Sequence, residues 1–322
     1  MYQIKQKPED FIVKEIPLYG LDEDGEYFYF WLIKKDYTTM GAIKTIAKRL
    51  NIPLKRFSFA GTKDKVAVTK QVISIQSIKK ERVEKIENLK LTDIKLKYIG
   101  NGITPICLGD LEGNEFVIIV RNLKTKRIKS KEKIPNLYGP QRFSKNNAEI
   151  GRYLVKNNFK KATDLIDQEE VKYHLEENPV DFVGALRKIP LKIRKIYIHA
   201  YQGLLWNKTI ESYLKTGPHK NIKIPLIGFG TEIESIQDYN LKEIILDILH
   251  KEEISERDFI LPKIKELSSE GGKRDLFIKP KDLNIKITED EENKEKFKAV
   301  VSFFLQKGSY GTVVIDSIFQ GL

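Results

Sequence analysis

The 322-residue sequence predicts an α+β protein in which a sheet-based domain is interrupted by a mostly helical insertion. Residues 1–148 consist mainly of short apolar or alternating segments typical of strands, without the regular strand–helix alternation of a parallel α/β fold. Residues 149–273 place apolar side chains at the 3.6-residue spacing of helices. Strand-like segments return over residues 274–322. We therefore expect domain boundaries near residues 148 and 273.

The first part of the chain is predicted to contain five strands and one clear helix. Residues 27–34 (YFYFWLIK) are apolar on both faces, which is typical of a central strand in a covered sheet. Residues 38–51 have apolar side chains at helical spacing, with Thr39 as the N-cap. The other predicted strands are residues 56–61 and 66–75, on either side of the turn GTKDK, and residues 93–100 and 114–122.

The rest of the chain is predicted to be helical first and then to return to strands. Helical periodicity is found over residues 146–157, 159–166, 181–189, 193–215 and 241–253. The predicted final strands are residues 274–280, 283–290, 298–306 and 311–316. Residues 288–298 (TEDEENKEKFK) are highly charged and are predicted to form a hairpin loop between the last strands.

The composition indicates a soluble globular protein, with 41% hydrophobic and 32% charged residues. Lys and Arg number 57 against 45 Asp and Glu, so the formal net charge is +12. This charge has two interpretations, a lysine-rich solvated surface as in proteins of heat-loving organisms, or a polyanionic partner, most often nucleic acid. We expect a cytoplasmic protein, because the N-terminus is polar and no apolar run approaches a membrane span.

The cysteine and histidine content argues against a metal site. The single cysteine, Cys107, excludes an internal disulfide and a cysteine-cluster zinc site. The four histidines are scattered without ligand spacing. We therefore expect neither a bound metal nor a metal-dependent reaction.

The turn GTKDK places Asp64 between Lys63 and Lys65. These cations favour the ionised carboxylate, which can act as nucleophile or general base on a nucleic acid. The alternative is a turn residue that makes a surface ion pair. Aspartyl-phosphate chemistry is disfavoured, because the second carboxylate it needs two residues on is replaced by Val66.

Two further motifs combine groups that nucleic-acid chemistry uses. Residues 136–143 (NLYGPQRF) surround a Gly-Pro turn with amide, aromatic and guanidinium groups, which can stack a flipped base and bind its edges and phosphates. Residues 303–314 (FFLQKGSYGTVV) have strand character followed by a bend between Gly308 and Gly311. Each motif alone also fits ordinary packing, as a packed turn and as a core strand with a hairpin.

Taken together, the motifs resemble the TruD family of tRNA pseudouridine synthases. The matching segments come in the family's order and cover most of the chain: residues 7–17 (KPEDFIVKEIP), 59–71 (FAGTKDKVAVTKQ), 136–143, 198–207 (IHAYQGLLWN) and 303–314. The resemblance implies a mixed or antiparallel-sheet catalytic domain, residues 1–148 and 274–322, split by a TruD-type insertion domain, residues 149–273. The lysine- and isoleucine-rich, cysteine-poor composition is compatible with an archaeal member.

The implied activity is conversion of a uridine in tRNA to pseudouridine. Such enzymes break the glycosidic bond, turn the uracil and rejoin it through carbon, with an essential aspartate and without cofactor or metal. Carried over, that aspartate is Asp64, acting either by attack on the ribose or by proton abstraction. We expect the protein to be a monomer. We expect its partner to be tRNA, with other RNAs as further candidates. The alternative is an RNA-binding or tRNA-remodelling protein of the same fold in which isomerisation is secondary.

The resemblance also implies roles for residues around Asp64. Lys5 matches the family's basic residue beside the aspartate, and Asn136 matches the asparagine next to the active site. Tyr138 stands where the family usually has Phe, and we expect it to keep the stacking role. Phe303 is expected to form a second wall of the uracil pocket. Phe11 is the aromatic residue of the EDF motif, with core packing as an alternative.

The remaining predictions concern RNA contacts and the residues around the motifs. Candidates for substrate binding are Arg142, Lys63, Thr62 and Gln141, and further candidate phosphate ligands are Lys65, Lys70 and Arg121. His199 is expected to be a helix-packing histidine, and Phe304, on the opposite strand face from Phe303, a core residue. Departures from the family pattern are Gly203, Trp206 and Gln306, together with a rather short insertion.

Overall fold

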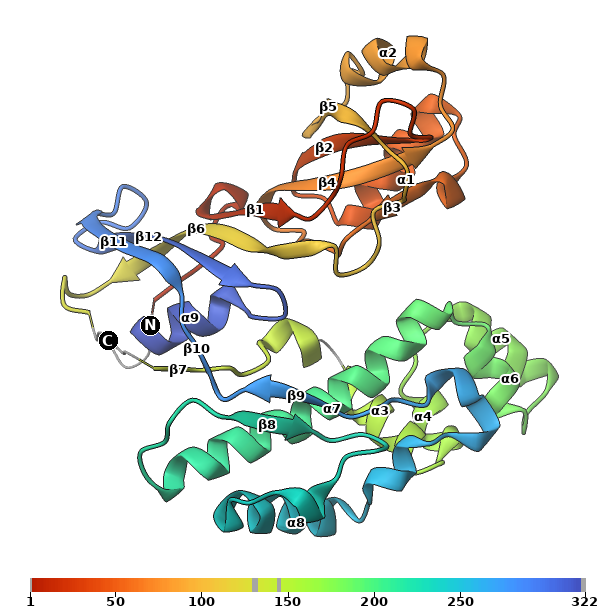
Figure 1. The fold of residues 1–322 in the computed structure, drawn as a ribbon, viewed down its shortest axis with the longest axis vertical. Coiled ribbons are helices and arrows are strands. Elements are labelled where there is room, and N and C mark those ends of the chain that lie inside the picture. Colours follow the sequence, from red (N-terminus) through yellow and green to blue (C-terminus); the bar gives the residue numbers. More distant parts are fainter. Residues whose placement is uncertain (1, 129–132, 144–145, 320–322) are drawn as a thin grey trace. The chain divides into compact units, whose positions relative to one another are not determined.

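The structure is a computed structural model that describes residues 2–128, 133–143 and 146–319 (Figure 1). Its contacts divide the chain into two compact units. The first, which we call the sheet unit, comprises Met1–Glu132 and Lys279–Leu322, and the second, the helical unit, comprises Lys133–Ile278. The helical unit is therefore inserted into the sequence of the sheet unit. By their contacts, residues 133–148 and 274–278 belong to the helical unit. The domain boundaries expected near residues 148 and 273 stay a prediction.

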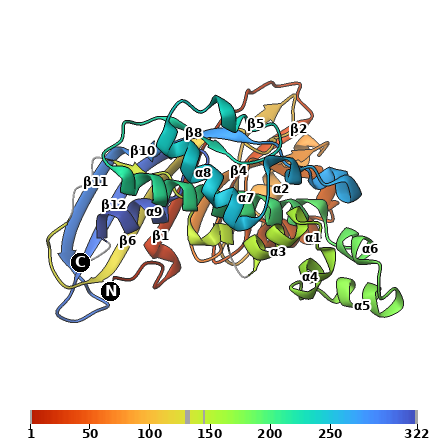
Figure 2. The ribbon, with the colours of Figure 1, turned by 90° about the horizontal axis from the view of Figure 1, so that it is seen from below.

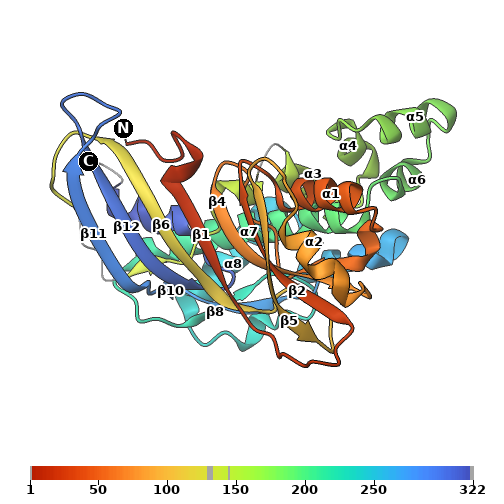
Figure 3. The ribbon, with the colours of Figure 1, turned by 90° about the horizontal axis from the view of Figure 1, so that it is seen from above.

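One mixed sheet forms the centre of the sheet unit (Figure 3). Its strand order is β11-β12-β6-β1-β4-β2-β5, and β3 pairs with β4. Only β1 and β4 are parallel among these pairs, so the predicted α+β class is confirmed. The strands are β1 (Phe11–Pro17), β2 (Tyr27–Lys35), β3 (Phe57–Phe59), β4 (Val68–Gln76), β5 (Ile94–Gly102), β6 (Leu111–Leu123), β11 (Lys281–Glu289) and β12 (Phe297–Gln306).

The strand predictions hold for most of this sheet, and the charged loop lies between β11 and β12 as expected. Strand β1, in contrast, was not anticipated as a strand.

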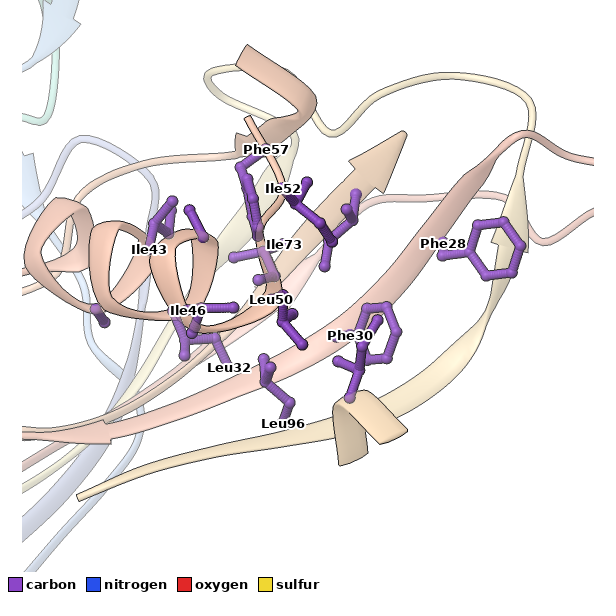
Figure 4. Packing of buried hydrophobic residues seen from close by; sticks show 14 of the residues in the cluster. Phe28, Phe30, Leu32, Ile43, Ile46, Leu50, Ile52, Phe57, Ile73 and Leu96 are labelled. Carbon is purple, nitrogen blue, oxygen red and sulfur yellow. The ribbon is translucent and has the colours of Figure 1, made fainter. Parts of the chain in front are cut away.

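Helix α1 (Thr39–Leu50) covers one end of the sheet and forms a core with β2, β3, β4 and β5 (Figure 4). Its buried side chains recur at helical spacing, so a single apolar face meets the strands. The predicted N-cap is wrong by one residue. Thr38 is the N-cap, and its hydroxyl accepts a hydrogen bond of 3.0 Å from the Gly41 N–H. Thr39 is buried and has another role, described below. The short helix α2 (Val83–Glu87) precedes β5.

The strand predicted over residues 311–316 is wrong, because these residues belong to helix α9 (Gly311–Phe319). The segment is apolar at nearly every position, so periodicity could not separate a buried strand from a buried helix. Gly311 lets the helix approach β6 closely, since a Cβ there would lie 2.9 Å from ring atoms of Phe116. The helix lies beside β12 and β6 (Figures 1 and 2).

The helical unit is built around the long helix α7 (Leu191–Tyr213), which contacts α3 and α8 (Figure 2). The other helices are α3 (Asn147–Val155), α4 (Phe159–Asp164), α5 (Glu169–Glu177), α6 (Phe182–Arg187) and α8 (Tyr239–Glu252). All five predicted helical segments are confirmed, and α5 was missed. Two short antiparallel ribbons also form, β7 (Ile134–Pro135) with β10 (Phe277–Ile278), and β8 (Lys223–Leu226) with β9 (Gly272–Asp275). The strand predicted over residues 274–280 contains β10 and overlaps the end of β9, whereas β7 and β8 were missed.

Candidate active site

The loop that carries Asp64 connects the antiparallel strands β3 and β4. Because β1 and β4 run parallel, the segments that lead into these two strands lie at the same edge of the sheet. Lys5 precedes β1 and Asp64 precedes β4, and the Lys5 Nζ lies 3.1 Å from the Asp64 Oδ2. The two side chains are 18% and 27% exposed, so the pair is sheltered and still reachable from solvent.

Lys5 owes its position to an unusual backbone. The residue has a φ of 57°, in the left-handed region that side chains other than glycine seldom adopt. Just before it, Gln3 exchanges two backbone hydrogen bonds with Arg121 on β6, which fixes the approach of the chain. The Lys5 Nζ also lies 4.1 Å from the centre of the Phe11 ring. The left-handed backbone and the contact with Phe11 together place the Lys5 ammonium beside Asp64.

Lys34, at the end of β2, holds the backbone of the Asp64 loop. Its side chain is buried, and Nζ donates hydrogen bonds to the carbonyl oxygens of Asp64 (2.8 Å) and Tyr37 (2.5 Å). Burial lowers the pKa of Lys34 to about 8, with the charge of Asp64 opposing the shift and that of Lys63 adding to it. Sequence reasoning missed this residue. The signal was a lysine at the end of an otherwise apolar predicted strand.

Lys63 points inward from the same loop. Its Nζ lies 2.6 Å from the Glu15 Oε2, and the two side chains are 8% and 0% exposed. Glu15 also accepts a hydrogen bond from the Val72 N–H at 3.1 Å. A paired ammonium buried to this extent holds the loop against β1 and β4.

Two further side chains bind the backbone of the loop. The Thr39 hydroxyl accepts a hydrogen bond from the Lys63 N–H (2.9 Å) and donates one to the Gln71 Oε1 (2.8 Å). The Gln71 amide in turn donates to the Gly61 carbonyl at 2.8 Å. The backbone of the turn is thus fixed at residues 61, 63 and 64, while Thr62 is exposed between them.

Three phenylalanine rings form a row across adjacent strands on one face of the sheet. Phe11 on β1 meets Phe116 on β6 edge-on at 6.2 Å, and Phe116 stacks on Phe303 of β12 at 5.3 Å. Phe11 and Phe303 are 2% and 3% exposed. Phe304 faces the other way and is half-buried, with the Lys281 ammonium 5.3 Å from its ring, so the expected core position is wrong.

The candidate phosphate ligands of the sheet unit differ in exposure. Arg121 is 1% exposed and forms ion pairs with Asp10, Asp290 and Glu291, so the prediction that it faces RNA is wrong. Lys70 is half-buried, with its Nζ 4.4 Å from the centre of a Trp31 ring. Lys65 is exposed.

In the helical unit, the C-terminal half of α7 clamps the segment that contains Asn136 and Tyr138. Trp206 donates a hydrogen bond from Nε1 to the Asn136 carbonyl at 2.8 Å. Asn207 forms two reciprocal bonds with the Tyr138 backbone, accepting from its N–H (2.8 Å) and donating to its carbonyl (2.9 Å). This clamp explains the motif at residues 198–207, to which sequence reasoning gave no chemical role.

The Asn136 side chain is 7% exposed and engaged at both ends of its amide. Arg274 donates from Nη2 to the Asn136 Oδ1, and the Asn136 Nδ2 donates to the Asp275 carbonyl, each at 2.9 Å. The Arg274 guanidinium also lies 4.2 Å from the centre of the Tyr138 ring. Sequence reasoning missed Arg274, because an arginine that opens a predicted strand gives no hint of its partners.

Arg142 lies beside Tyr138 as well, with its guanidinium carbon 5.3 Å from the ring centre. Gln141, next to it, is exposed. His199 on α7 is half-buried; burial, together with the positive charges of Arg142 and Lys195, lowers its pKa to about 4. A histidine that stays neutral at pH 7 agrees with the expected packing role.

The predicted site residues therefore fall into two groups. The sheet unit brings together Lys5, Asp64 and Phe11, and the helical unit brings together Asn136, Tyr138 and Arg142. Over the described residues, no His, Cys, Asp and Glu side chains gather in threes or more as metal ligands. In the same part of the chain, no helix has the length and apolar character needed to cross a membrane.

Comparison with known proteins places the chain in a family. The sequence profile of tRNA pseudouridine synthase D (TruD) matches residues 2–174, 164–223 and 218–318. A relative from Methanosarcina barkeri, named "Probable tRNA pseudouridine synthase D", is 30% identical over 411 positions, covering 97% of this chain and 92% of the relative. The tRNA pseudouridine synthase D of Aquifex aeolicus is 31% identical over 382 positions, covering 98% of each. Both alignments exceed 322 residues, so these relatives contain internal segments that this chain lacks.

The fold is similar to that of a Methanosarcina mazei protein whose crystal structure carries the TruD name. The TM-score is 0.72 at 28% sequence identity, and the similarity covers 99% of this chain and 93% of that one. The matched residues include all the motifs that carry Asp64, Asn136 and Phe303. The chain therefore belongs to the TruD family of tRNA pseudouridine synthases.

Proposed function

We propose that this protein converts a uridine in tRNA to pseudouridine, with Asp64 as the essential catalytic group. The observation that carries the proposal is the Lys5–Asp64 ion pair, in which a partly exposed carboxylate lies on a loop whose backbone is fixed at residues 61, 63 and 64. Isomerisation changes neither the redox state nor the composition of the substrate. A carboxylate that attacks the ribose or removes its proton therefore suffices, and we propose a monomer without metal or cofactor.

Other residues have supporting roles in this proposal. Lys5 provides the charge opposite the carboxylate, and Lys34 and Lys63 position the loop from within the fold. Phe11 and Phe303 are proposed to form walls of the uracil site, at the two ends of the phenylalanine row.

The helical unit is proposed to contact the RNA through one aromatic ring and the polar groups around it. Tyr138 stacks on a base, and Asn136 holds the segment that presents this ring. Thr62, in the sheet unit, and Gln141 and Arg142 supply hydrogen-bond donors to RNA.

The test follows tritium released from tRNA that carries uridine labelled at C5, because this carbon loses its hydrogen when the new bond forms. Asp64→Asn keeps the shape of the side chain and removes its charge, and we expect the rate to fall at least about a thousand-fold. The matched control is Asp24→Asn, the same change at an exposed position of the sheet unit, which should retain the wild-type rate.

Two outcomes contradict the proposal. Full activity of Asp64→Asn would remove Asp64 from the chemistry. Wild-type protein that binds tRNA tightly and releases no tritium from any cellular RNA would favour the RNA-binding alternative.

A further inference from the structure

We propose that Arg142, Lys195 and His199 form a binding site for one backbone phosphate of RNA, beside the ring of Tyr138. The proposal rests on the proposed function for the identity of the ligand. It adds a defined site in the helical unit, made of side chains from α7 and from the turn at residues 139–143.

The first argument is the geometry of α7. Lys195, His199 and Gly203 are spaced by four residues, so they lie along one face of the helix. A Cβ at Gly203 would lie 3.2 Å from the Tyr138 Cδ2 and 3.5 Å from the Arg142 Cγ. The turn that carries Tyr138 and Arg142 therefore packs directly on this face, and the missing side chain of Gly203 makes the room.

The second argument is the contrast between the two guanidinium groups at the Tyr138 ring. Arg274 is engaged, because it donates to the Asn136 Oδ1. Arg142 makes no ion pair and no side-chain hydrogen bond with any residue in the described part of the chain. A guanidinium whose donors have no protein acceptor favours an anion that accepts from them, so a phosphate at Arg142 would be stabilised.

The third argument is the local charge. Neither Lys195 nor His199 makes an ion pair or side-chain hydrogen bond with any residue that the structure describes. Burial, and then the charges of Arg142 and Lys195, keep the pKa of His199 near 4, so its ring is a neutral donor at pH 7. Two cations that make no ion pair with a described acid, together with a neutral imidazole, are a donor set for a phosphodiester, and the guanidinium fork can bind its oxygens in pairs.

The position of the site indicates which phosphate it would take. The Arg142 guanidinium lies 5.3 Å from the Tyr138 ring, on which the proposed function stacks a base. A phosphate bound to Arg142 then belongs to the same nucleotide or to its immediate neighbour. The site would thus hold the strand where the base leaves its stack.

The experiment measures binding of labelled bulk tRNA, purified from cells that lack the enzyme, by fluorescence anisotropy over a range of KCl concentrations. A lost phosphate contact lowers the slope of log Kd against log salt by about one unit. We expect this decrease for Arg142→Gln and for Lys195→Gln. The matched control is Lys215→Gln, an exposed lysine just beyond the end of α7, which should keep the wild-type slope.

Lys195 is exposed and makes no side-chain bond within the described chain, so Lys195→Gln remains informative even where Arg142→Gln disturbs the packing on Tyr138. The proposal is overturned if folded Arg142→Gln and Lys195→Gln both keep the wild-type slope and Kd. Tritium release by the same wild-type preparation separates the two proposals. Unchanged slopes with full isomerisation refute only the phosphate site, and lowered slopes without isomerisation refute only the catalytic function.

Discussion

Two lysines serve the same aspartate in different ways. Lys5 meets the Asp64 carboxylate at 3.1 Å and remains partly exposed, so its charge acts on the group that is proposed to react. Lys34 is buried and binds the Asp64 carbonyl, so it acts on the position of the backbone. The buried Lys34 ammonium thus holds the shape of the loop without needing to contact the substrate. Division of charge and position between two residues is typical of a preorganised site.

Lys34 predicts a pH dependence of stability. Its folded pKa is about 8 against an ordinary 10.5, so between these values the unfolded chain holds a proton that the folded chain has lost. The unfolding free energy therefore rises with pH across this window, by at most about 1.4 kcal/mol per unit for this group. Lys34→Met should remove that rise, and it should slow isomerisation by freeing the Asp64 carbonyl.

Urea unfolding from about pH 7.5 to about pH 9.5 measures the effect. Lys44→Met, at an exposed position of α1, is the control and should keep the wild-type rise. If the unfolding free energies of wild type and Lys34→Met change in the same way with pH, Lys34 has the same pKa in the folded and the unfolded chain, and the prediction is wrong.

At the scale of the element, α7 organises the helical unit. Its C-terminal half clamps the backbone at residues 136–138, and Gly203 lets the turn with Arg142 approach. Gln202 extends this role, because its amide donates to the Ile227 carbonyl at 2.8 Å and accepts from the Ser269 hydroxyl at 2.9 Å. One helix thus holds three loops that are distant in sequence, which explains why its buried positions are not confined to one face.

Asn207 gives a test of this clamp. Asn207→Ala removes both bonds to the backbone of the buried Tyr138 and should lower the unfolding free energy by about 1–3 kcal/mol. The loss of order at Tyr138 should also reduce the rate of pseudouridine formation. Glu211→Ala, one helical turn further on and exposed, is the matched control. Denaturation and single-turnover kinetics measure the two effects, and equal behaviour of both variants would argue against the clamp.

At the scale of the whole molecule, the sheet unit is assembled from residues on both sides of the insertion. Strand β12, after the insertion, pairs with β6, before it. Arg121 joins the same parts, because its guanidinium binds Asp10 near the N-terminus and Asp290 after β11, both at 2.8 Å. All three side chains are at most 1% exposed. The sheet therefore requires the returning segment for its completion.

Arg121→Met should destabilise the protein strongly. The substitution leaves two buried carboxylates without their cation, which costs about 3–5 kcal/mol in comparable cases. Lys14→Met, at the exposed Lys14–Glu115 pair, should cost less than about 1 kcal/mol. Chemical denaturation of both variants at neutral pH measures the two losses. Equal, small losses for Arg121→Met and Lys14→Met would contradict a structural role for Arg121.

The wild-type protein should also lose stability in acid through this cluster. Burial alone would raise the pKa of Asp290, but hydrogen bonds from the Asn122 N–H, Asn293, the Glu292 N–H and Arg121 outweigh it and lower the pKa to about 2. The stabilisation is complete above the ordinary value of 3.8 and is lost as the pH falls towards 2. Arg121→Met should weaken this acid dependence.

The sequence by itself determined the fold class, most of the secondary structure and the family of this protein. Periodicity identified the α+β class, the helices of the insertion and most strands, because each depends on which side chains face a core. The motifs around Asp64 and Tyr138 placed the chain in its family, which the comparisons confirmed. Their predicted catalytic and binding roles await the experiments above.

Only the tertiary structure decided how charges and apolar segments are used. Arg121 and Lys63 resemble surface cations in the sequence, and both are buried because distant carboxylates meet them. Residues 311–316 have strand-like composition and form a helix, because an apolar segment takes the shape that its neighbours allow. Arg274 meets Asn136 from 138 residues away. Such partners are set by chain topology, and spacing along the sequence does not record them.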